Sequence, residues 1–203
     1  MTRRLPLLAE RALADTKATQ MQAASEYEHE LRGDSTISCR TGCANCCHHP
    51  FLVTVLEGLL LYRFLASHGK WTPSLRKQVH EARDKTLGLA FEVWLLSNIP
   101  CPLLDTRMKC TAYEARPVHC RTTFSVGDPE LCHPHKLGTN TPLADNTSVI
   151  VGFNIRVQEL LKKLGSHGRL MPLSEALLLA EAIDNDTLSI EASDIQYIHD
   201  LLR

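Results

Sequence analysis

Eight cysteines in two groups constrain this chain of 203 residues more than any other feature of its sequence. The first group lies within residues 39–47 and the second is spread over residues 101–132. The eight residues are Cys39, Cys43, Cys46, Cys47, Cys101, Cys110, Cys120 and Cys132. A Cys-x-x-Cys spacing lets two thiolates reach one ion from a single turn, and thiolates prefer zinc, copper(I) or iron–sulfur centres to calcium or magnesium. The pattern therefore predicts a metal-binding core in which at least four sulfurs, drawn from both groups, converge.

The alternative use of eight cysteines, in four disulfides, requires an oxidising compartment. The N-terminal residues do not form the apolar run of a signal peptide, because Glu10, Arg11 and Asp15 interrupt it. No apolar stretch of the sequence approaches the ~20 residues that span a bilayer. We therefore expect a cytoplasmic protein that does not insert into a membrane and uses its bunched cysteines as metal ligands or redox groups.

The sequence leaves the number of metal sites open. Adjacent side chains such as Cys46 and Cys47 point well apart, by ~100° on a helix, so one ion would rarely bind both. Four thiolates are enough for a tetrahedral zinc site or a cubane iron–sulfur cluster. Eight cysteines therefore suit two sites, or one site with a cysteine left over as a structural or redox thiol.

Outside the cysteine groups, the spacing of apolar residues predicts a mainly α-helical fold. Helices are expected over residues 3–31, 55–67, 73–97, 148–164, 174–183 and 193–202. Thr54 and Glu57 have the spacing of a capping box, and Thr72 with Pro73 suits the start of the third helix. Residues 148–153 are the segment that best fits a strand instead.

Residues 98–145 lack this periodicity and contain six prolines. Nearly fifty residues of irregular structure is long for an unsupported loop, so we expect bound metal to hold the segment in place. The whole chain, residues 1–203, is expected to form one small helical domain. In it, a loop-dominated, cysteine-rich region (34–145) makes the metal-binding core, and C-terminal helices (148–203) follow.

Several side chains near the cysteines could stabilise a thiolate-rich site, which carries excess negative charge. The basic residues within four positions of a cysteine include Arg40, Lys109, Arg116 and Arg121. Pro117 should turn the chain ahead of Cys120 and bring Arg116 or Arg121 back to the sulfurs, where the alternative is an ordinary surface cation. Tyr113 offers a hydroxyl that could reach a thiolate. The histidines that flank cysteines are His48, His49, His119, His133 and His135, and the sequence singles out none of them as a ligand.

The charge of the chain argues against two classes of partner. A formal net charge of -1 gives no general attraction to nucleic acid or to an anionic membrane. Residues 172–203, however, contain seven acidic residues and a single basic one, Arg203. We interpret this acidic run as a solvated helical face; the alternative is a docking surface for a basic protein partner.

The cysteines also stand in an order that resembles a known family. Cys39-x3-Cys43-x2-Cys46-Cys47 is followed by Cys101-Pro102, and then by a Cys-x-x-Tyr-x-x-Arg-Pro-x-x-Cys-Arg block over residues 110–121. This combination resembles the bacterial cysteine-cluster proteins of the CxxCxxCC type, which are described as zinc- or iron-chelating, and Cys132 fits the last cysteine of their pattern. The resemblance spans residues 39–132 and implies metal binding by the eight cysteines.

The function predicted from these observations is binding of zinc, iron or an iron–sulfur centre through the clustered cysteines. The alternative is a metal-dependent enzyme, either an oxidoreductase or a relative of protein N-methyltransferases. A similar cysteine domain occurs in flagellin lysine N-methylases, which are expected to use S-adenosylmethionine. Apart from residues 165–168 the chain has no glycine-rich loop suited to such a cofactor, so the resemblance does not carry the methylase activity over.

Overall fold

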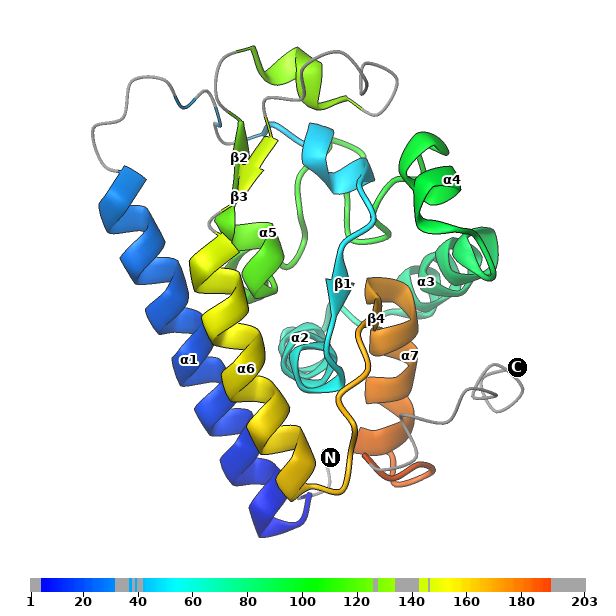
Figure 1. Cartoon of the computed structure of the whole chain (residues 1–203). Helices are drawn as coiled ribbons and strands as arrows, with labels where there is room; N and C mark the ends of the chain where they lie inside the picture. Colours follow the sequence, from blue (N-terminus) through cyan, green and yellow to red (C-terminus); the bar gives the residue numbers. More distant parts are fainter. Residues whose placement is uncertain are drawn as a thin grey trace.

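The computed structural model describes residues 5–31, 37, 39, 42–125, 128–133, 143–145 and 147–190. These residues form seven α-helices, three short 3-10 helices and four short strands (Figure 1). The helices are α1 (Leu7–Leu31), α2 (Val55–Ser67), α3 (Pro73–Thr86), α4 (Phe91–Leu96), α5 (Val118–Thr122), α6 (Thr147–Lys163) and α7 (Leu173–Asp184). The mainly α-helical fold predicted from the sequence is confirmed. Within the described ranges, no helix is both long enough and apolar enough to cross a membrane.

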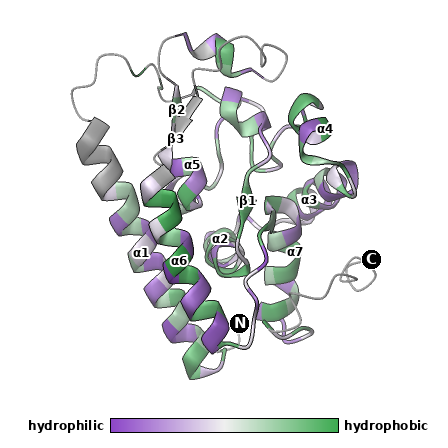
Figure 2. Ribbon diagram, in the orientation of Figure 1, coloured by the Kyte–Doolittle hydropathy of each residue, from purple (hydrophilic) through white to green (hydrophobic). Residues whose placement is uncertain are grey.

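Helix α2 lies at the centre of the fold. Figure 1 shows it end-on, between the antiparallel pair α1 and α6 on one side and α7 on the other. Its residues Leu56, Leu59, Leu61 and Leu65 are fully buried, and each contributes roughly 1.5–3 kcal/mol through removal of apolar surface from water. Gly58 permits the close approach of α7, because a Cβ there would lie 2.7 Å from the Ala176 carbonyl oxygen. Figure 2 shows that α7 is largely hydrophobic, as expected for a helix whose residues are mostly buried.

Ion pairs fix the outer helices to this core. Arg63 of α2 donates to Glu10 of α1 (2.9 Å) and to Asp184 of α7 (2.7 Å). Glu181 of α7 accepts from the Trp71 indole (2.9 Å) and from Arg76 of α3 (2.7 Å). Each of these bonds joins segments that are far apart in the sequence, so together they set how the helices are arranged.

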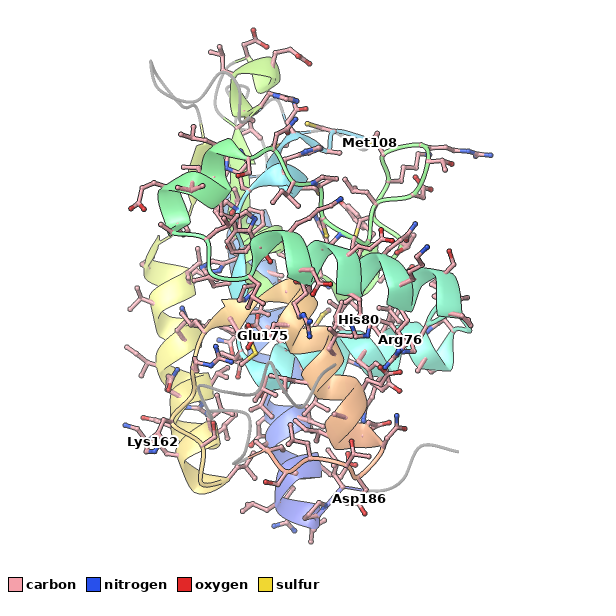
Figure 3. All side chains as sticks on the ribbon, turned by 90° about the vertical axis from the view of Figure 1, so that its right-hand side faces the viewer. Arg76, His80, Met108, Lys162, Glu175 and Asp186 are labelled. Carbon is pink, nitrogen blue, oxygen red and sulfur yellow. The ribbon has the colours of Figure 1, made fainter. Side chains whose placement is uncertain are left out.

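The acidic residues of α7 take part in these pairs, which corrects one interpretation of the sequence. Glu175 and Asp184 are each only 4% exposed, so they do not belong to a solvated face, and Glu175 pairs with Arg169. Figure 3 shows Asp186 at the far end of α7 from Glu175. Residues 191–203, with the helix expected at 193–202, lie outside the described residues.

The helix expected over residues 73–97 is two helices, so that prediction was wrong. Thr72 caps α3 as expected, through a bond from the Leu75 amide, but α3 ends at Thr86. Gly88 adopts a φ of +72°, which glycine tolerates and which takes the chain out of the helix before α4 begins. None of the side chains of α4 is buried, so no core packing favours continuation of α3.

The other boundaries agree more closely with the sequence. Both bonds of the capping box between Thr54 and Glu57 are present at the start of α2. Residues 148–153 lie in α6, not in a strand. The region expected to be irregular contains regular elements that are too short for periodicity to reveal, namely α5 and the antiparallel pair of β2 (Thr123–Ser125) with β3 (Leu143–Asp145). A second antiparallel pair joins β1 (Leu52–Val53) to β4 (Met171–Pro172).

Candidate metal centre

The first cysteine group is held by a turn and a 3-10 helix, η1 (Asn45–His48). Gly42 has a φ of +90°, a conformation that residues with a Cβ rarely adopt, and it turns the chain into Cys43. The Cys47 amide then donates to the Ala44 carbonyl oxygen (2.9 Å). Two turns within a few residues therefore place Cys43, Cys46 and Cys47 close together.

Cys101 and Cys110 are brought together by a tight chain reversal centred on Asp105. The Asp105 carboxylate accepts from the backbone amides of Arg107 (2.8 Å) and Lys109 (2.9 Å). Leu104 forms an isolated antiparallel bridge with Cys110. The prolines that made this segment look irregular thus flank a reversal that is tightly hydrogen-bonded.

Cys120 lies on α5, and the start of α5 is tied to the start of α2 by one buried carboxylate. Glu57 accepts from the Val118 amide (3.1 Å) as well as from the Thr54 amide (3.0 Å). Arg116 has an extended backbone (φ -55°, ψ 139°), outside the α region, as expected for the residue before Pro117. Burial raises the pKa of Glu57, against the lowering effect of its hydrogen bonds.

Backbone and side-chain bonds connect the two cysteine groups directly. The Cys101 amide donates to the Cys47 carbonyl oxygen (2.8 Å), across more than fifty residues of sequence. The Ser125 amide donates to the Cys39 sulfur (3.1 Å), and a nitrogen of His49 lies 2.7 Å from the Cys132 carbonyl oxygen. The fold therefore brings the two groups into one region.

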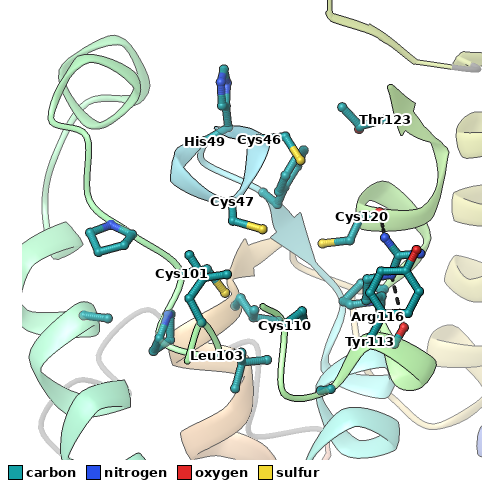
Figure 4. Close-up of a pocket in the computed structure, with 18 of the residues that line it drawn as sticks. Cys46, Cys47, His49, Cys101, Leu103, Cys110, Tyr113, Arg116, Cys120 and Thr123 are labelled. Atoms are coloured by element: carbon teal, nitrogen blue, oxygen red, sulfur yellow. Dashed lines mark hydrogen bonds between the residues drawn. The ribbon is translucent and has the colours of Figure 1, made fainter. Parts of the chain in front are cut away.

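The thiols surround a cavity of about 780 Å³. Seven of the eight cysteines line it: Cys39, Cys43, Cys46, Cys47, Cys101, Cys110 and Cys120. Figure 4 shows the sulfurs of Cys47 and Cys120 directed toward each other across it, with Cys101 nearby. Cys132 is not part of the lining and is only 3% exposed.

Burial makes several of these thiols hard to ionise in the absence of metal. It raises the pKa of Cys101 to about 12, and it raises the pKa of Cys120 well above its ordinary value. The pKa of Cys46 is raised first by a hydrogen bond with the Cys47 thiol and then by burial. Neighbouring thiols add to the effect at each position, so a cation bound among them would replace protons and relieve their mutual repulsion.

Arg116 is a cation that the structure places beside several of the sulfurs. It lines the cavity, lies over the Tyr113 ring at 3.7 Å and donates to the Cys120 carbonyl oxygen (3.1 Å). Its positive charge partly offsets the raised pKa of Cys46, Cys110 and Cys120. Tyr113 also lines the cavity, although it is 57% exposed.

The other cation predicted from this motif is used differently. Arg121 donates to the Arg116 carbonyl oxygen (2.8 Å) and to the Glu114 carbonyl oxygen, so it holds the turn instead of lining the cavity. Lys109 does line the cavity. Arg40 lies outside the described residues.

Sequence reasoning missed three contributors to the site. Lys70 lowers the pKa of Cys110 through its charge, and the backbone of Ser125 bonds Cys39. Glu57 was identified only as a cap of α2, without its bond to Val118. No local pattern could reveal these contacts, because each joins residues that are dozens of positions apart.

The histidines near the cysteines mostly bond to backbone carbonyls. His119 lies 3.0 Å from the Leu52 carbonyl oxygen, and His48 lies 3.4 Å from that of Asn98. Burial lowers the pKa of His49, which favours its neutral form. His135 lies outside the described residues.

The chemistry of this region fits a thiophilic metal, because soft sulfur donors gather in a partly enclosed space with a neutralising arginine. Among the side chains that the structure describes, no three Cys, His, Asp or Glu residues are already arranged as a metal site. The ligand set is therefore a prediction. What the structure supplies is the proximity and the environment of the donors.

One comparison with known proteins gives a match. A family model described as "CxxCxxCC: Putative zinc- or iron-chelating domain" matches residues 38–142, just over half of the chain. No curated protein and no solved structure matches it.

Proposed function

Because the chain belongs to the CxxCxxCC family of zinc- or iron-chelating domains, we propose that it binds zinc or iron through the eight cysteines, with iron held singly or as an iron–sulfur cluster. The observation that carries this proposal is the cavity lined by seven thiols from two distant parts of the sequence. Four thiolates would satisfy either tetrahedral zinc or a cubane cluster.

The role that the structure supports best for the metal is to hold the cysteine-rich region against the helices. Residues 98–117 contain one isolated bridge, one short 3-10 helix (Tyr113–Ala115) and turns, and they contribute only Leu103 and Ala112 to the buried apolar core that α2 and α7 share. A metal bound by sulfurs from residues 39–47 and 101–132 would cross-link segments that contain little regular secondary structure. Binding free energy at such a site is also folding free energy.

The test is metal analysis of the full chain purified without oxygen. We expect zinc or iron in stoichiometric amounts, with brown colour and visible absorption if iron–sulfur is present and no colour if the metal is zinc. Cys120→Ser should lower the metal content and speed proteolysis within residues 98–145. His68→Ala, which changes an exposed histidine at the C-terminal end of α2, should do neither. Full metal content and unchanged protease resistance in Cys120→Ser would contradict the proposal.

A metal-dependent enzyme is the second candidate, and the size of the cavity favours it. A volume of about 780 Å³ falls within the range of roughly 300–1,000 Å³ found for pockets that bind organic ligands. Its walls include apolar side chains such as Trp94, Ile99 and Leu103. The bound metal would supply a Lewis acid or a redox centre, Arg116 would orient an anionic group, and the apolar walls would exclude water.

S-adenosylmethionine is a direct probe of the methyltransferase alternative. The glycine loop at residues 165–168 packs on its own chain, since the Gln158 side chain donates to the Gly168 carbonyl oxygen and fills the space beside Gly168. A saturable increase in the melting temperature with S-adenosylmethionine would support the enzyme. No increase with metal-loaded protein would remove the methyltransferase version of it.

The cytoplasmic location and the basic protein partner remain predictions. A partner of the acidic C-terminal residues would have to use those beyond α7, because Glu175, Glu181 and Asp184 already bond arginines of the same chain. Salt-dependent binding of a Lys-rich peptide to the full chain, lost when residues 191–203 are removed, would support this partner. No binding at low salt would contradict it.

A further inference from the structure

The thiols fall into two sets within the region that the fold assembles. The first set surrounds Ser125, at the edge of the β2–β3 pair. Its amide bonds the Cys39 sulfur, and the buried Cys132 thiol is close enough to Cys39 and Cys43 to interact electrostatically with both. Three thiols from residues 39, 43 and 132 are therefore neighbours.

The second set surrounds the end of the cavity near α5. Cys101 and Cys110 are neighbours across the chain reversal at Asp105, and the buried Cys120 thiol interacts with both of them. In Figure 4 the three residues enclose one part of the cavity, with the Cys120 sulfur directed inward. These three thiols come from the second sequence group alone.

Cys46 and Cys47 lie between the two sets. The Cys47 carbonyl oxygen accepts from the Cys101 amide, and Figure 4 shows the Cys47 sulfur directed toward Cys120. Cys46 points elsewhere in the same view, toward Thr123 at the start of β2. It interacts electrostatically with Cys39 and Cys132 and also with Cys101, Cys110 and Cys120, so it lies between the two sets. Because the Cys47 sulfur is directed toward Cys120 and Cys46 is directed toward β2, we assign Cys47 to the second set and Cys46 to the first.

We propose that the eight cysteines form two metal centres of four thiols each, which meet at the Cys46–Cys47 pair. The first centre comprises Cys39, Cys43, Cys46 and Cys132, and the second comprises Cys47, Cys101, Cys110 and Cys120. Each takes a thiophilic ion that prefers tetrahedral sulfur coordination, such as Zn²⁺. This partition rests on the proposed metal binding and adds the number of centres and the membership of each. It gives the Cys-Cys dipeptide a purpose, since adjacent thiols are poor ligands for one ion but can serve two neighbouring ones.

The test is titration of the reduced, metal-free full chain with Co²⁺, whose thiolate complexes absorb strongly. We expect the absorption of the parent to saturate at two equivalents. Cys43→Ser in the first centre and Cys110→Ser in the second should each saturate at one, and the double variant should give no tetrathiolate absorption. These two cysteines are only half-buried, and each belongs to one set alone. The control His68→Ala should keep two equivalents.

The outcomes separate the partition from the metal binding on which it rests. Saturation of the parent at one equivalent, with loss of all binding in both single variants, would mean a single mixed centre and overturn the partition. No binding by the parent would overturn the metal-binding proposal as well.

A second measurement does not depend on variants that fold. The parent is loaded with one equivalent of Zn²⁺ and alkylated with iodoacetamide, and its unmodified cysteines are mapped by peptide mass spectrometry. We expect molecules with four unmodified cysteines, all from the same centre. A protected set that mixes Cys39 or Cys43 with Cys101 or Cys110 in one molecule would overturn the assignment.

Discussion

Glu57→Gln tests how the helical core positions the metal centre. The Glu57 carboxylate accepts three bonds, from the Thr54 amide (3.0 Å), the Thr54 hydroxyl (3.1 Å) and the Val118 amide (3.1 Å). Glutamine has one carbonyl oxygen and one amino group, so it can accept on one side only. Because two donors lie on the Thr54 side, we expect the oxygen to stay there and the Val118 amide to lose its acceptor.

The size of the effect follows from these contacts. A buried donor left without an acceptor costs about 1–3 kcal/mol, and removal of the buried negative charge offsets part of that. We expect Glu57→Gln to lower the free energy of unfolding by about 1–2 kcal/mol. Because α5 then loses the bond at its first turn, Cys120 is held less firmly, and metal affinity should fall by about tenfold.

Three measurements check this chain of effects. Urea denaturation gives the free energy of unfolding, hydrogen exchange gives the protection of the Val118 amide, and competition with a chelator gives metal affinity. Glu81→Gln is the matched control, since Glu81 is exposed on α3 and its pair with Lys77 (3.7 Å) should be worth less than about 0.5 kcal/mol. Equal protection of Val118 in parent and variant would refute the proposed link between α2 and α5.

The same residue predicts a dependence on pH. Burial raises the pKa of Glu57 above its ordinary value of 4.5, so the folded state holds this proton more tightly than the unfolded state does. Its contribution to stability is then present below pH 4.5 and is lost as the pH rises through the folded-state pKa. In the metal-free proteins, the parent should therefore exceed Glu57→Gln in free energy of unfolding by less and less as the pH rises from 4.5 toward neutrality. A constant or widening difference would show that the pKa of Glu57 is not raised.

Substitutions at four further positions test other parts of the structure. Gly58→Ala should lower the free energy of unfolding by about 1–3 kcal/mol, because the new Cβ would lie 2.9 Å from that of Ala176. Gly152→Ala, whose Cβ would meet nothing within 4 Å, should instead raise the free energy of unfolding by about 0.5–1 kcal/mol. Urea denaturation measures both changes, and two changes of the same sign would contradict the reasoning. Arg63→Ala should cost about 3 kcal/mol in thermal or urea unfolding, since it leaves the buried Asp184 without its partner; a loss below 0.5 kcal/mol would mean that solvent reaches this carboxylate. Arg116→Ala should weaken metal binding at least tenfold in chelator competition, whereas Arg116→Lys should retain part of the affinity. Parent-like affinity in the alanine variant would mean that Arg116 does not act on the metal centre and only contacts Tyr113.

Local features of the chain could be read from the sequence because their partners lie within a few residues. The capping box of Thr54 and Glu57 and the start of α3 at Thr72 depend on bonds spanning three positions, and both formed as predicted. The cysteine order was equally informative, since it identified the family, which is described as zinc- or iron-chelating, before any geometry was known. The break at Gly88 was misjudged, because a glycine within an apolar pattern does not reveal whether tertiary packing will hold the helix together.

Only the tertiary structure decided which residues share the candidate site. Glu57 and Val118 are 61 positions apart, and the Cys39 sulfur meets the amide of a residue 86 positions away. The burial of Glu175 and Asp184, which the sequence suggested were solvated, depends on where Arg169 and Arg63 lie. The sequence by itself determined the helices and the sulfur chemistry, because these follow from bonds and donor atoms within short segments. The meeting of the two cysteine groups required bonds between distant residues, such as those of Val118 to Glu57 and of Cys101 to Cys47, and such bonds form only when the elements pack around a common core.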